Sequence, residues 1–237
     1  MADGVNWTGT DDEDRYVGTS NDDTLDGGRG DDEILAGAGA DTIEGGRGND
    51  VIYGGEGNDV ISDEDLTSTS GQKLYGEGGN DTITGGGQIY GGDGNDTIEV
   101  TETGNQQYEG RVEGGDGDDK ITIDNGTTGR VYAQSGDDQL FINNAVYYVI
   151  DAGDGDDAVV LDGNWAGSAF DWSSSYGVQL QAGDDTLTVS DWSGNDSTNV
   201  HFKGGSGDDT YTGRDVDKTN NTYDYFYGED GEDTITG

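Results

Sequence analysis

Apolar and polar positions repeat in this chain with a strict nine-residue period that runs from Gly18 to Ser62. Each frame begins with four glycine-rich positions, continues with acidic residues and places one large apolar residue at its eighth position. The eighth positions are Leu25, Ile34, Ile43, Ile52 and Ile61, and the sixth positions are Asp23, Asp32, Asp41, Asp50 and Asp59. So short and regular a period predicts a solenoid, with six residues of each frame in a turn and three in a strand.

The frames GGRGDDEIL from Gly27, GGRGNDVIY from Gly45 and GGEGNDVIS from Gly54 carry the most regular form of the pattern. They resemble the RTX repeat, the hemolysin-type calcium-binding nonapeptide G-G-x-G-x-D-x-U-x, in which U is a large apolar residue. The resemblance implies an all-β fold, a right-handed parallel β-roll (a β-solenoid) in which two nonapeptides form one coil. It also implies multiple calcium ions (Ca2+), stacked between successive turns.

The glycines and aspartates of these turns are the candidate metal-binding residues. Glycine lets the backbone adopt positive φ and turn its carbonyl groups inward, where an aspartate carboxylate completes a cage. In the family's geometry the partner turn lies eighteen residues on, which groups Asp14, Asp32 and Asp50 on one edge and Asp23, Asp41 and Asp59 on the other. The alternative is that the acidic glycine turns are only solvated. The candidate aspartates are Asp23, Asp32, Asp41, Asp50, Asp59, Asp81, Asp96, Asp119, Asp138, Asp157, Asp185, Asp209 and Asp233, and the candidate turn residues are Gly27, Arg29, Gly45, Arg47, Gly54, Glu56, Gly91 and Asp93.

Beyond Ser62 the turn motif recurs at intervals near or above eighteen residues, which indicates one whole coil per interval. A short apolar-led pair precedes each turn and predicts the returning strand of that coil. These pairs are Leu74-Tyr75, Ile89-Tyr90, Val112-Glu113, Val131-Tyr132, Ile150-Asp151, Val178-Gln179, Phe202-Lys203 and Phe226-Tyr227. We therefore expect one edge, the ladder edge, to carry an unbroken row of aspartates from Asp23 to Asp233. The other edge, the loop edge, should keep calcium turns only up to Asp50 and then carry irregular loops through the C-terminal two-thirds.

The chain is accordingly divided into three parts of a single solenoid domain. Residues 1–17 are a degenerate repeat or cap, residues 18–62 are the regular roll, and residues 63–237 continue the roll with one calcium edge and one loop edge. The larger loops are Asp63 to Gln72, Thr101 to Gly110, Asp162 to Tyr176, Ser190 to Asn199 and Gly213 to Asp224. Their aromatics either anchor a partner such as a polysaccharide or cell surface, or pack back over the roll; they are Tyr108, Trp165, Phe170, Trp172, Tyr176, Trp192 and Tyr223.

The composition indicates that the chain needs bound cations in order to fold. Fifty-two acidic against ten basic residues give a formal net charge of −42, and this self-repulsion opposes compaction unless cations neutralise it. A coil of two nonapeptides buries two large apolar side chains worth about 1.5–3 kcal/mol each, whereas ordering eighteen residues costs about 1–2 kcal/mol per residue. Calcium, which accepts six to eight oxygen ligands, should supply much of the difference. We therefore expect calcium binding and folding to be coupled.

The same composition narrows the classes of partner and compartment. The negative charge makes nucleic acid and anionic membranes poor partners. The chain has no cysteine, and so offers neither disulfides nor thiolate metal sites. Its apolar runs are too short for a signal peptide or a membrane span, so we expect no membrane insertion and, for a secreted protein, export without an N-terminal signal.

An enzyme is not expected. The single histidine, His201, has no serine or cysteine at a recognisable spacing, and the carboxylates follow a metal-binding register rather than forming an acid–base pair. No cap is evident at either end, so we expect copies to associate head to tail into a calcium-dependent extracellular fibre or matrix. One alternative is a monomeric, calcium-dependent folding or export module of a larger adhesin, enzyme or toxin.

A lesser alternative is an ice-binding module. Outward threonines are paired in Thr82-x-Thr84, Thr186-x-Thr188, Thr210-x-Thr212 and Thr234-x-Thr236. The expected row is interrupted at Glu99, Lys120, Gln139, Phe141, Ala158 and Val160. The preference of threonine for exposed strands explains the pairs without an ice surface.

Overall fold

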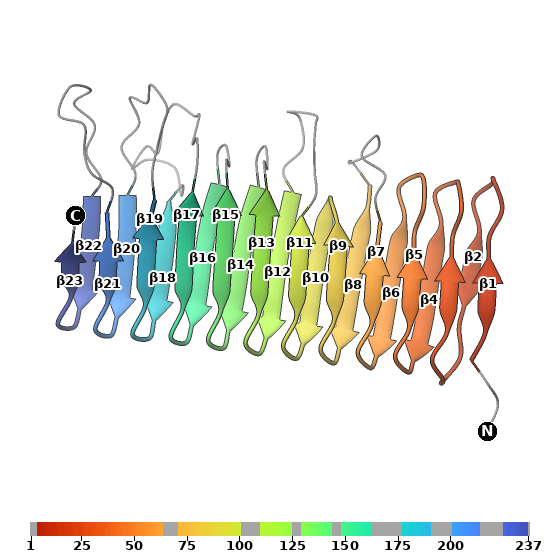
Figure 1. Cartoon of the computed structure of the whole chain (residues 1–237), viewed down its shortest axis with the longest axis horizontal. Helices are drawn as coiled ribbons and strands as arrows, with labels where there is room; N and C mark the ends of the chain where they lie inside the picture. Colours follow the sequence, from red (N-terminus) through yellow and green to blue (C-terminus); the bar gives the residue numbers. More distant parts are fainter. Residues whose placement is uncertain are drawn as a thin grey trace.

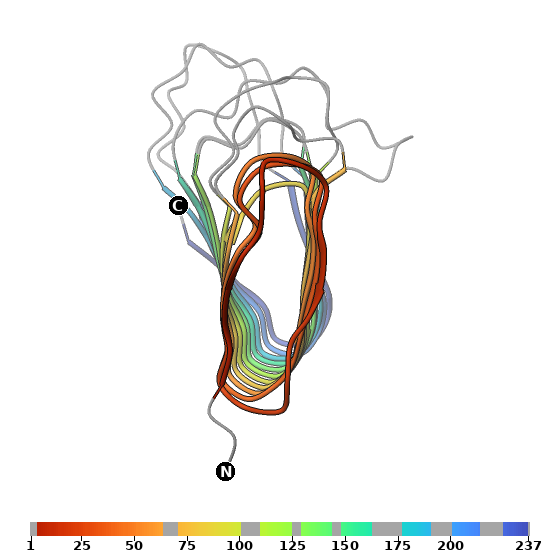
Figure 2. The ribbon, with the colours of Figure 1, turned by 90° about the vertical axis from the view of Figure 1, so that its right-hand side faces the viewer.

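The protein is a parallel β-roll built from two facing sheets (Figures 1 and 2). The computed structural model describes residues 4–63, 71–100, 110–124, 129–143, 148–162, 177–190, 201–213 and 225–236. These residues contain strands and no helix, so none of them forms a helix able to cross a membrane. The chain passes from one sheet to the other at every turn, and the all-β solenoid predicted from the sequence is confirmed.

The odd-numbered strands form a twelve-stranded sheet and the even-numbered strands an eleven-stranded sheet. The odd-numbered strands are β1 (Asn6–Thr8), β3 (Thr24–Asp26), β5 (Thr42–Glu44), β7 (Val60–Ser62), β9 (Thr82–Gly85), β11 (Thr97–Val100), β13 (Lys120–Asp124), β15 (Gln139–Asn143), β17 (Ala158–Asp162), β19 (Thr186–Val189), β21 (Thr210–Thr212) and β23 (Thr234–Thr236). The even-numbered strands are β2 (Arg15–Val17), β4 (Glu33–Ala38), β6 (Val51–Glu56), β8 (Lys73–Gly78), β10 (Gln88–Asp93), β12 (Gly110–Asp116), β14 (Gly129–Ser135), β16 (Tyr148–Asp154), β18 (Val178–Ala182), β20 (His201–Ser206) and β22 (Tyr225–Asp230).

Each coil stacks on the next with equivalent positions in register. Leu25 pairs with Ile43, and Ile34 with Ile52, so residues eighteen apart occupy the same place in successive coils. Where the interval is longer, the register persists; Ile61 of β7 pairs with Ile83 of β9. The described strands on either side of the longer interval therefore keep the register of the sheet.

The eighth position of every frame points into the space between the sheets, which explains its apolar character. Leu25, Ile34, Ile43 and Ile52 are at most 1 % exposed, and the predicted returning strands supply Leu74 in the same way. The expectation of three-residue strands holds for β1, β3, β5, β7, β21 and β23 of the odd-numbered sheet and for β2 of the even-numbered sheet. In the even-numbered sheet most strands continue through the start of the next turn and reach six or seven residues.

A third apolar column appears at the loop edge in the later coils. The odd-numbered strands lengthen to four or five residues from β9 to β19, and each strand from β11 to β19 adds one buried apolar side chain. These residues pair in sequence along the sheet and are Val100, Ile123, Ile142, Leu161 and Val189. Hydrophobic burial thus closes the loop edge beside these described strands, in place of the glycine turns of the first coils.

Aromatic side chains lie at both ends of the core. Trp7 and Tyr16 of the first coil stack with ring centroids 4.4 Å apart. At the other end Tyr211 stacks on Phe226 at 5.4 Å, while Ile235 of the last strand is 64 % exposed. The degenerate frame from Gly9 therefore forms part of a complete first coil with β1 and β2.

The outer faces of the sheets carry stacked side chains rather than one uniform surface. Tyr53, Tyr75 and Tyr90 form a continuous stack on the even-numbered sheet, with centroids 4.8 Å apart. On the odd-numbered sheet, Thr97 pairs with Lys120, whose ammonium lies over the ring of Phe141. The threonine row is therefore interrupted as the sequence indicated. The seven loop aromatics, and most residues of the five larger loops, lie outside the described residues.

Candidate metal centre

The aspartates of the ladder edge lie in the turns that join each even-numbered strand to the following odd-numbered strand (Figure 1). The backbone N–H of each donates to Oδ1 of the equivalent aspartate in the next coil. This bond is 2.6 Å from Asp23 to Asp41, 2.8 Å from Asp96 to Asp119 and 3.2 Å from Asp209 to Asp233. The same bond joins every neighbouring pair between these ends. The row predicted from Asp23 to Asp233 is continuous in the structure.

The loop edge begins with the same arrangement. The N–H of Asp14 donates to Oδ1 of Asp32 at 2.7 Å, and that of Asp32 to Oδ1 of Asp50 at 2.8 Å. The pairing at eighteen residues is thus present on both edges of the first coils. These bonds occupy one carboxylate oxygen and hold the side chain in a fixed orientation.

The second carboxylate oxygen is buried and receives no hydrogen bond within the described residues. It has this environment in Asp32, Asp41, Asp50, Asp59, Asp81, Asp96, Asp119, Asp138, Asp157, Asp185 and Asp209. Each of these residues is at most 2 % exposed. A buried ionised oxygen without a partner is costly, so a whole row of them calls for protons or cations.

In turns that begin with glycine, a carbonyl oxygen from the next coil lies beside the second carboxylate oxygen, above that glycine; this holds for Asp32, Asp59, Asp81, Asp96, Asp119 and Asp209. A Cβ added to Gly27 would lie 2.5 Å from the Gly45 carbonyl oxygen and 2.7 Å from Asp32 Oδ2. A Cβ added to Gly54 would lie 2.5 Å from Asp59 Oδ2 and 2.9 Å from the Gly76 carbonyl oxygen. We call this space, bounded by one carboxylate and one carbonyl oxygen, a cradle.

The donor set of a cradle fits a hard cation. Carboxylate and carbonyl oxygens are the ligands that calcium takes, in flexible geometry. Among the described residues no three acidic, histidine or cysteine side chains converge on one point. Each cradle therefore has to draw most of its ligands from the backbone, which explains why glycine-rich turns accompany the aspartates. When bound, calcium would supply the positive charge that the buried oxygens lack.

The predicted turn residues divide into two groups. First-position residues, such as Gly27 and Gly54, are buried and line the cradles. Third-position side chains are exposed, and the carbonyl oxygens of Arg47, Glu56 and Asp93 accept N–H groups of the preceding coil at 2.7–2.8 Å. A carbonyl oxygen has a second lone pair, so this bond leaves it able to bind a cation.

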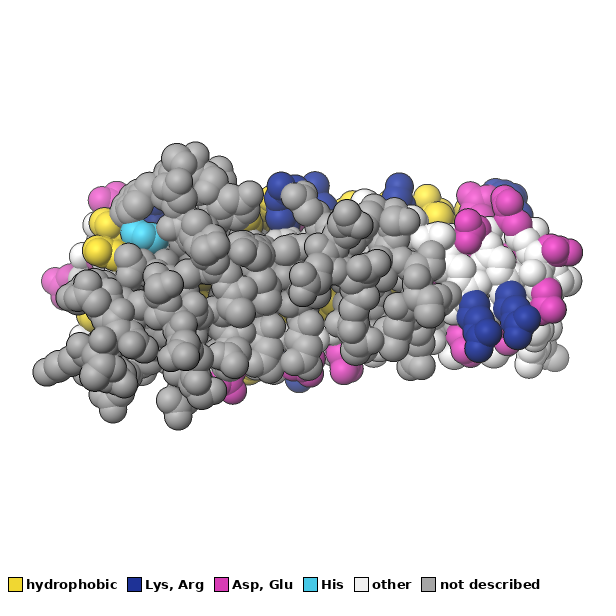
Figure 3. Space-filling view, turned by 90° about the horizontal axis from the view of Figure 1, so that it is seen from above, with side chains coloured by type: hydrophobic (Ala, Val, Ile, Leu, Met, Phe, Trp, Pro, Cys, Tyr) yellow, Lys and Arg dark blue, Asp and Glu magenta, His cyan; other side chains and the backbone are white. Residues whose placement is uncertain are grey.

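The arginines at third positions moderate the charge of the first coils. Arg29 Nε lies 3.8 Å from Asp11 Oδ1, and both side chains are exposed. Seen from the loop edge, basic and acidic side chains lie side by side over the N-terminal coils (Figure 3). An exposed pair of this kind contributes little to stability, so the arginines do not replace cations in the cradles.

Without a bound cation, burial raises the pKa of the ladder aspartates. Desolvation is the largest cause, the backbone hydrogen bond opposes it, and neighbouring carboxylates add to it. The pKa is raised to about 6 for Asp50, Asp59, Asp81 and Asp119, to about 7 for Asp96, Asp157 and Asp185, and to about 8 for Asp138. It is also raised for Asp32, Asp41 and Asp209. The metal-free row therefore competes for protons near neutral pH.

A second row of hydrogen bonds, which was not predicted from the sequence, is formed by the asparagine or aspartate at the fifth position of most turns. The N–H of Asn95 donates to Asn80 Oδ1 at 3.0 Å, and that of Asp118 donates to Asn95 Oδ1 at 3.1 Å. This row runs in the opposite sense to the sixth-position row, because here the later coil donates to the earlier one. The recurrence of asparagine or aspartate at this position was the available signal.

The first position of the ladder edge is not always glycine. Ala36, Ala133, Ala152 and Leu180 stand there, and all four are fully buried. Their Cβ atoms occupy the place that is open in the glycine turns. The cradles next to Asp138, Asp157 and Asp185 are therefore more apolar than those of the regular coils, and we expect them to bind calcium more weakly.

Adding a methyl group to a glycine cradle tests this expectation. Gly54→Ala should weaken calcium binding by roughly tenfold, about 1.4 kcal/mol, because the new Cβ meets Asp59 Oδ2 and the Gly76 carbonyl oxygen. Calcium titration by isothermal calorimetry measures the change. The reverse change in the neighbouring coil, Ala36→Gly, is the control and should strengthen binding. Equal affinities in all three proteins would show that the cradle does not hold the cation.

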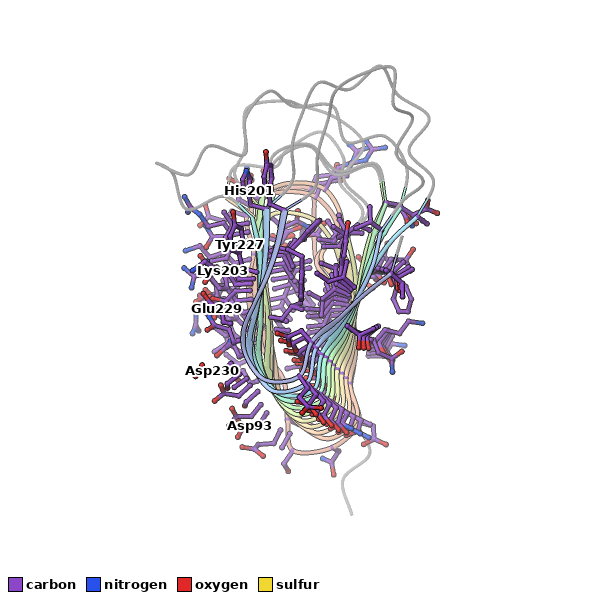
Figure 4. The ribbon with its side chains drawn as sticks, turned by 90° about the vertical axis from the view of Figure 1, so that its left-hand side faces the viewer. Asp93, His201, Lys203, Tyr227, Glu229 and Asp230 are labelled. Carbon is purple, nitrogen blue, oxygen red and sulfur yellow. The ribbon has the colours of Figure 1, made fainter. Side chains whose placement is uncertain are left out.

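His201 lies apart from the aspartate rows. It belongs to β20 and stacks on Tyr225 of β22 with centroids 4.8 Å apart, toward the loop edge, whereas Glu229 and Asp230 lie toward the ladder edge (Figure 4). Desolvation lowers its pKa. The prediction that the chain is not an enzyme remains a prediction.

Comparison with protein families gives one match. The family model described as RTX calcium-binding nonapeptide repeat (4 copies) matches residues 8–43, 35–62, 73–89, 88–100 and 220–237. A comparison with curated proteins finds no match. The matched residues include the regular turns of both edges. Between residues 100 and 220 no family match exists, but the aspartate row continues through Asp119, Asp138, Asp157, Asp185 and Asp209.

Proposed function

Because the chain carries RTX calcium-binding nonapeptide repeats in a parallel β-roll, we propose that it is a secreted structural protein that folds on binding several calcium ions and stacks end to end. The observation that supports calcium-dependent folding is the row of buried carboxylate oxygens without hydrogen-bond partners. Secretion is consistent with the calcium-dependent folding proposed here. Calcium modules that work outside cells bind calcium with dissociation constants of about 10⁻⁴–10⁻³ M, so such a roll would fold only after export.

End-to-end stacking is supported by the two terminal coils. The final strands, β22 and β23, are sheet edges with exposed Tyr225 and Ile235, and an edge strand is a template for further pairing. The first coil presents Trp7 and Tyr16 in the core positions. Contacts between two different ends do not close on themselves and therefore give open filaments.

The junction between copies would differ from the contacts within a roll. Val5 stands in the sixth-position place of the first ladder-edge turn, since its N–H donates to Asp23 Oδ1 and its carbonyl oxygen accepts the N–H of Thr24. At this position Val5 therefore offers no carboxylate to continue the row beyond Asp233. The junction we propose rests on apolar side chains and backbone hydrogen bonds.

Electron microscopy tests the assembly. In millimolar calcium we expect filaments that disappear when calcium is chelated. Ile235→Lys should abolish the filaments and leave calcium binding intact, because a charge in an edge strand blocks pairing. Thr186→Lys, on an exposed mid-roll position of the outer face, is the matched control and should still form filaments.

Dispersed particles at all calcium concentrations would contradict the fibre. They would favour the alternative, a calcium-dependent folding or export module of a larger adhesin, enzyme or toxin. In that case the exposed Ile235 and Tyr225 would be covered by another segment of the larger protein. Binding to a polysaccharide or cell surface would then be the next property to measure.

A further inference from the structure

Asp63 occupies an unusual place at the loop edge. In the first coils the position that follows the outward residue of each odd-numbered strand is glycine, and its N–H donates to the next coil: Gly27 to Glu44 and Gly45 to Ser62. Asp63 makes the equivalent bond to Thr84. It therefore stands where the repeat would have its first glycine.

The residues that occupy the equivalent position in the coils before and after Asp63 are chemically different. Before it come the cradle glycines Gly27 and Gly45. After Gly85 come the buried apolar residues that begin with Val100 and Ile123. Asp63 itself is only 2 % exposed. It marks the boundary between the part of the loop edge closed by cradles and the part closed by apolar side chains.

The side chain of Asp63 takes the place of a backbone carbonyl group. In the cradle above Gly27, the oxygen that faces the Asp32 carboxylate is the carbonyl oxygen of Gly45. Above Gly45 it is instead a carboxylate: an added Cβ would lie 2.8 Å from Asp63 Oδ2 and 2.9 Å from Asp50 Oδ2. The Asp63 carbonyl oxygen is turned away and accepts a hydrogen bond from Gln72 Nε2 at 3.4 Å.

Two buried carboxylates thus share one cradle. Asp50 is fully buried, and its Oδ2 receives no hydrogen bond within the described residues although it points into this space. Ionised together beside an apolar column, two carboxylates repel each other and lose their hydration. Without a cation, an interaction between the two side chains offsets only part of the cost of burying Asp50. A divalent cation between them would remove both costs.

We propose that Asp63, a residue outside the nonapeptide turns, joins Asp50 in holding a divalent cation in the last cradle of the loop edge. The proposal rests on the calcium binding proposed above. The affinity of calcium sites depends on the number of charged ligands. With two carboxylates where the other cradles have one, this site binds calcium more tightly than its neighbours, and it anchors the end of β7.

Native mass spectrometry tests the site, because it counts bound ions one by one. The intact chain is sprayed from ammonium acetate with added calcium acetate, at a concentration that fills only the tightest sites. Asp63→Asn should carry one calcium ion fewer than the wild type. Asp124→Asn is the control, since Asp124 is exposed and lies one residue beyond the apolar column; it should carry the wild-type number.

The possible results separate this site from the general function. An unchanged ion count in Asp63→Asn would overturn the site and leave calcium binding by the repeats intact. A wild type that binds no calcium would overturn both. If the circular dichroism of Asp63→Asn shows a loss of fold, Asp63→Leu replaces it, because leucine continues the apolar column of Val100 and Ile123. This variant should fold and also lack one ion, and a wild-type count would again contradict the site.

Discussion

Chelating calcium at pH 7.5 is expected to unfold the whole β-roll. Thirteen described aspartates are buried, and they are Asp23, Asp32, Asp41, Asp50, Asp59, Asp63, Asp81, Asp96, Asp119, Asp138, Asp157, Asp185 and Asp209. Each uncompensated buried carboxylate costs several kcal/mol, whereas a whole domain is stable by only about 5–15 kcal/mol. Without cations the sum of these costs exceeds any stability that the narrow core can supply.

Far-UV circular dichroism measures this loss. The β-sheet signal should vanish in EGTA and return on adding excess calcium. Magnesium at equal ionic strength is the control; it should restore less of the signal, since it demands octahedral geometry and gives up its water reluctantly. A spectrum that is unchanged in EGTA at neutral pH would contradict calcium-coupled folding. Full recovery in magnesium or sodium chloride would show that the cations act only by screening.

The main features of the fold could be predicted because they depend on short-range spacing. A nine-residue period fixes which side chains face inward, so Ile34 and Ile52 could be assigned to one core column from the sequence. The same spacing places Asp23 next to Asp41. Even the irregular intervals kept this relation, because insertions at the loop edge leave the register of the sheets untouched.

The features that could not be predicted depend on how a strand continues after its repeat ends. Nothing local distinguishes Asp63 from the acidic residues that follow it in the chain. Its burial arises because β7 keeps the register of the glycine column for one more residue. In the same way, Val100 and Ile123 enter the core only because β11 and β13 are longer than three residues.

The turn forms even where its sequence departs from the nonapeptide consensus. Gln134 and Gln181 adopt positive φ of 85° and 80° at a second position where the regular frames have glycine. Alanine or leucine stands at the first position of the same coils. The aspartate row nevertheless continues, since Asp119 donates to Asp138 at 2.7 Å and Asp138 to Asp157 at 2.9 Å. Both turns keep glycine at the fourth position, aspartate at the sixth and an apolar residue at the eighth, so glycine at the first two positions is not required for the coil.

Acid should stabilise the metal-free roll and weaken its binding of calcium. Burial raises the folded-state pKa of central ladder aspartates, to about 6 for Asp59 and about 8 for Asp138, against 3.8 for the unshifted group. The folded state therefore binds more protons than the unfolded state in this range. The stabilisation is fully present below pH 4 and is lost as the pH rises through about 6 to 8. In EGTA, lowering the pH from 7.5 to 5 should thus restore β-structure.

Calcium titrations followed by circular dichroism at pH 5.5, 6.5 and 7.5 test the opposite effect on binding. The calcium midpoint should rise as the pH falls, because protons and calcium compete for the same oxygens. Asp138→Asn, which mimics the protonated acid, should make the metal-free roll more stable at pH 7.5 and reduce the pH dependence. Asp124→Asn is the control, because Asp124 is exposed at the end of β13, and this variant should leave that dependence unchanged. A midpoint independent of pH would mean that the buried carboxylates do not bind the cations.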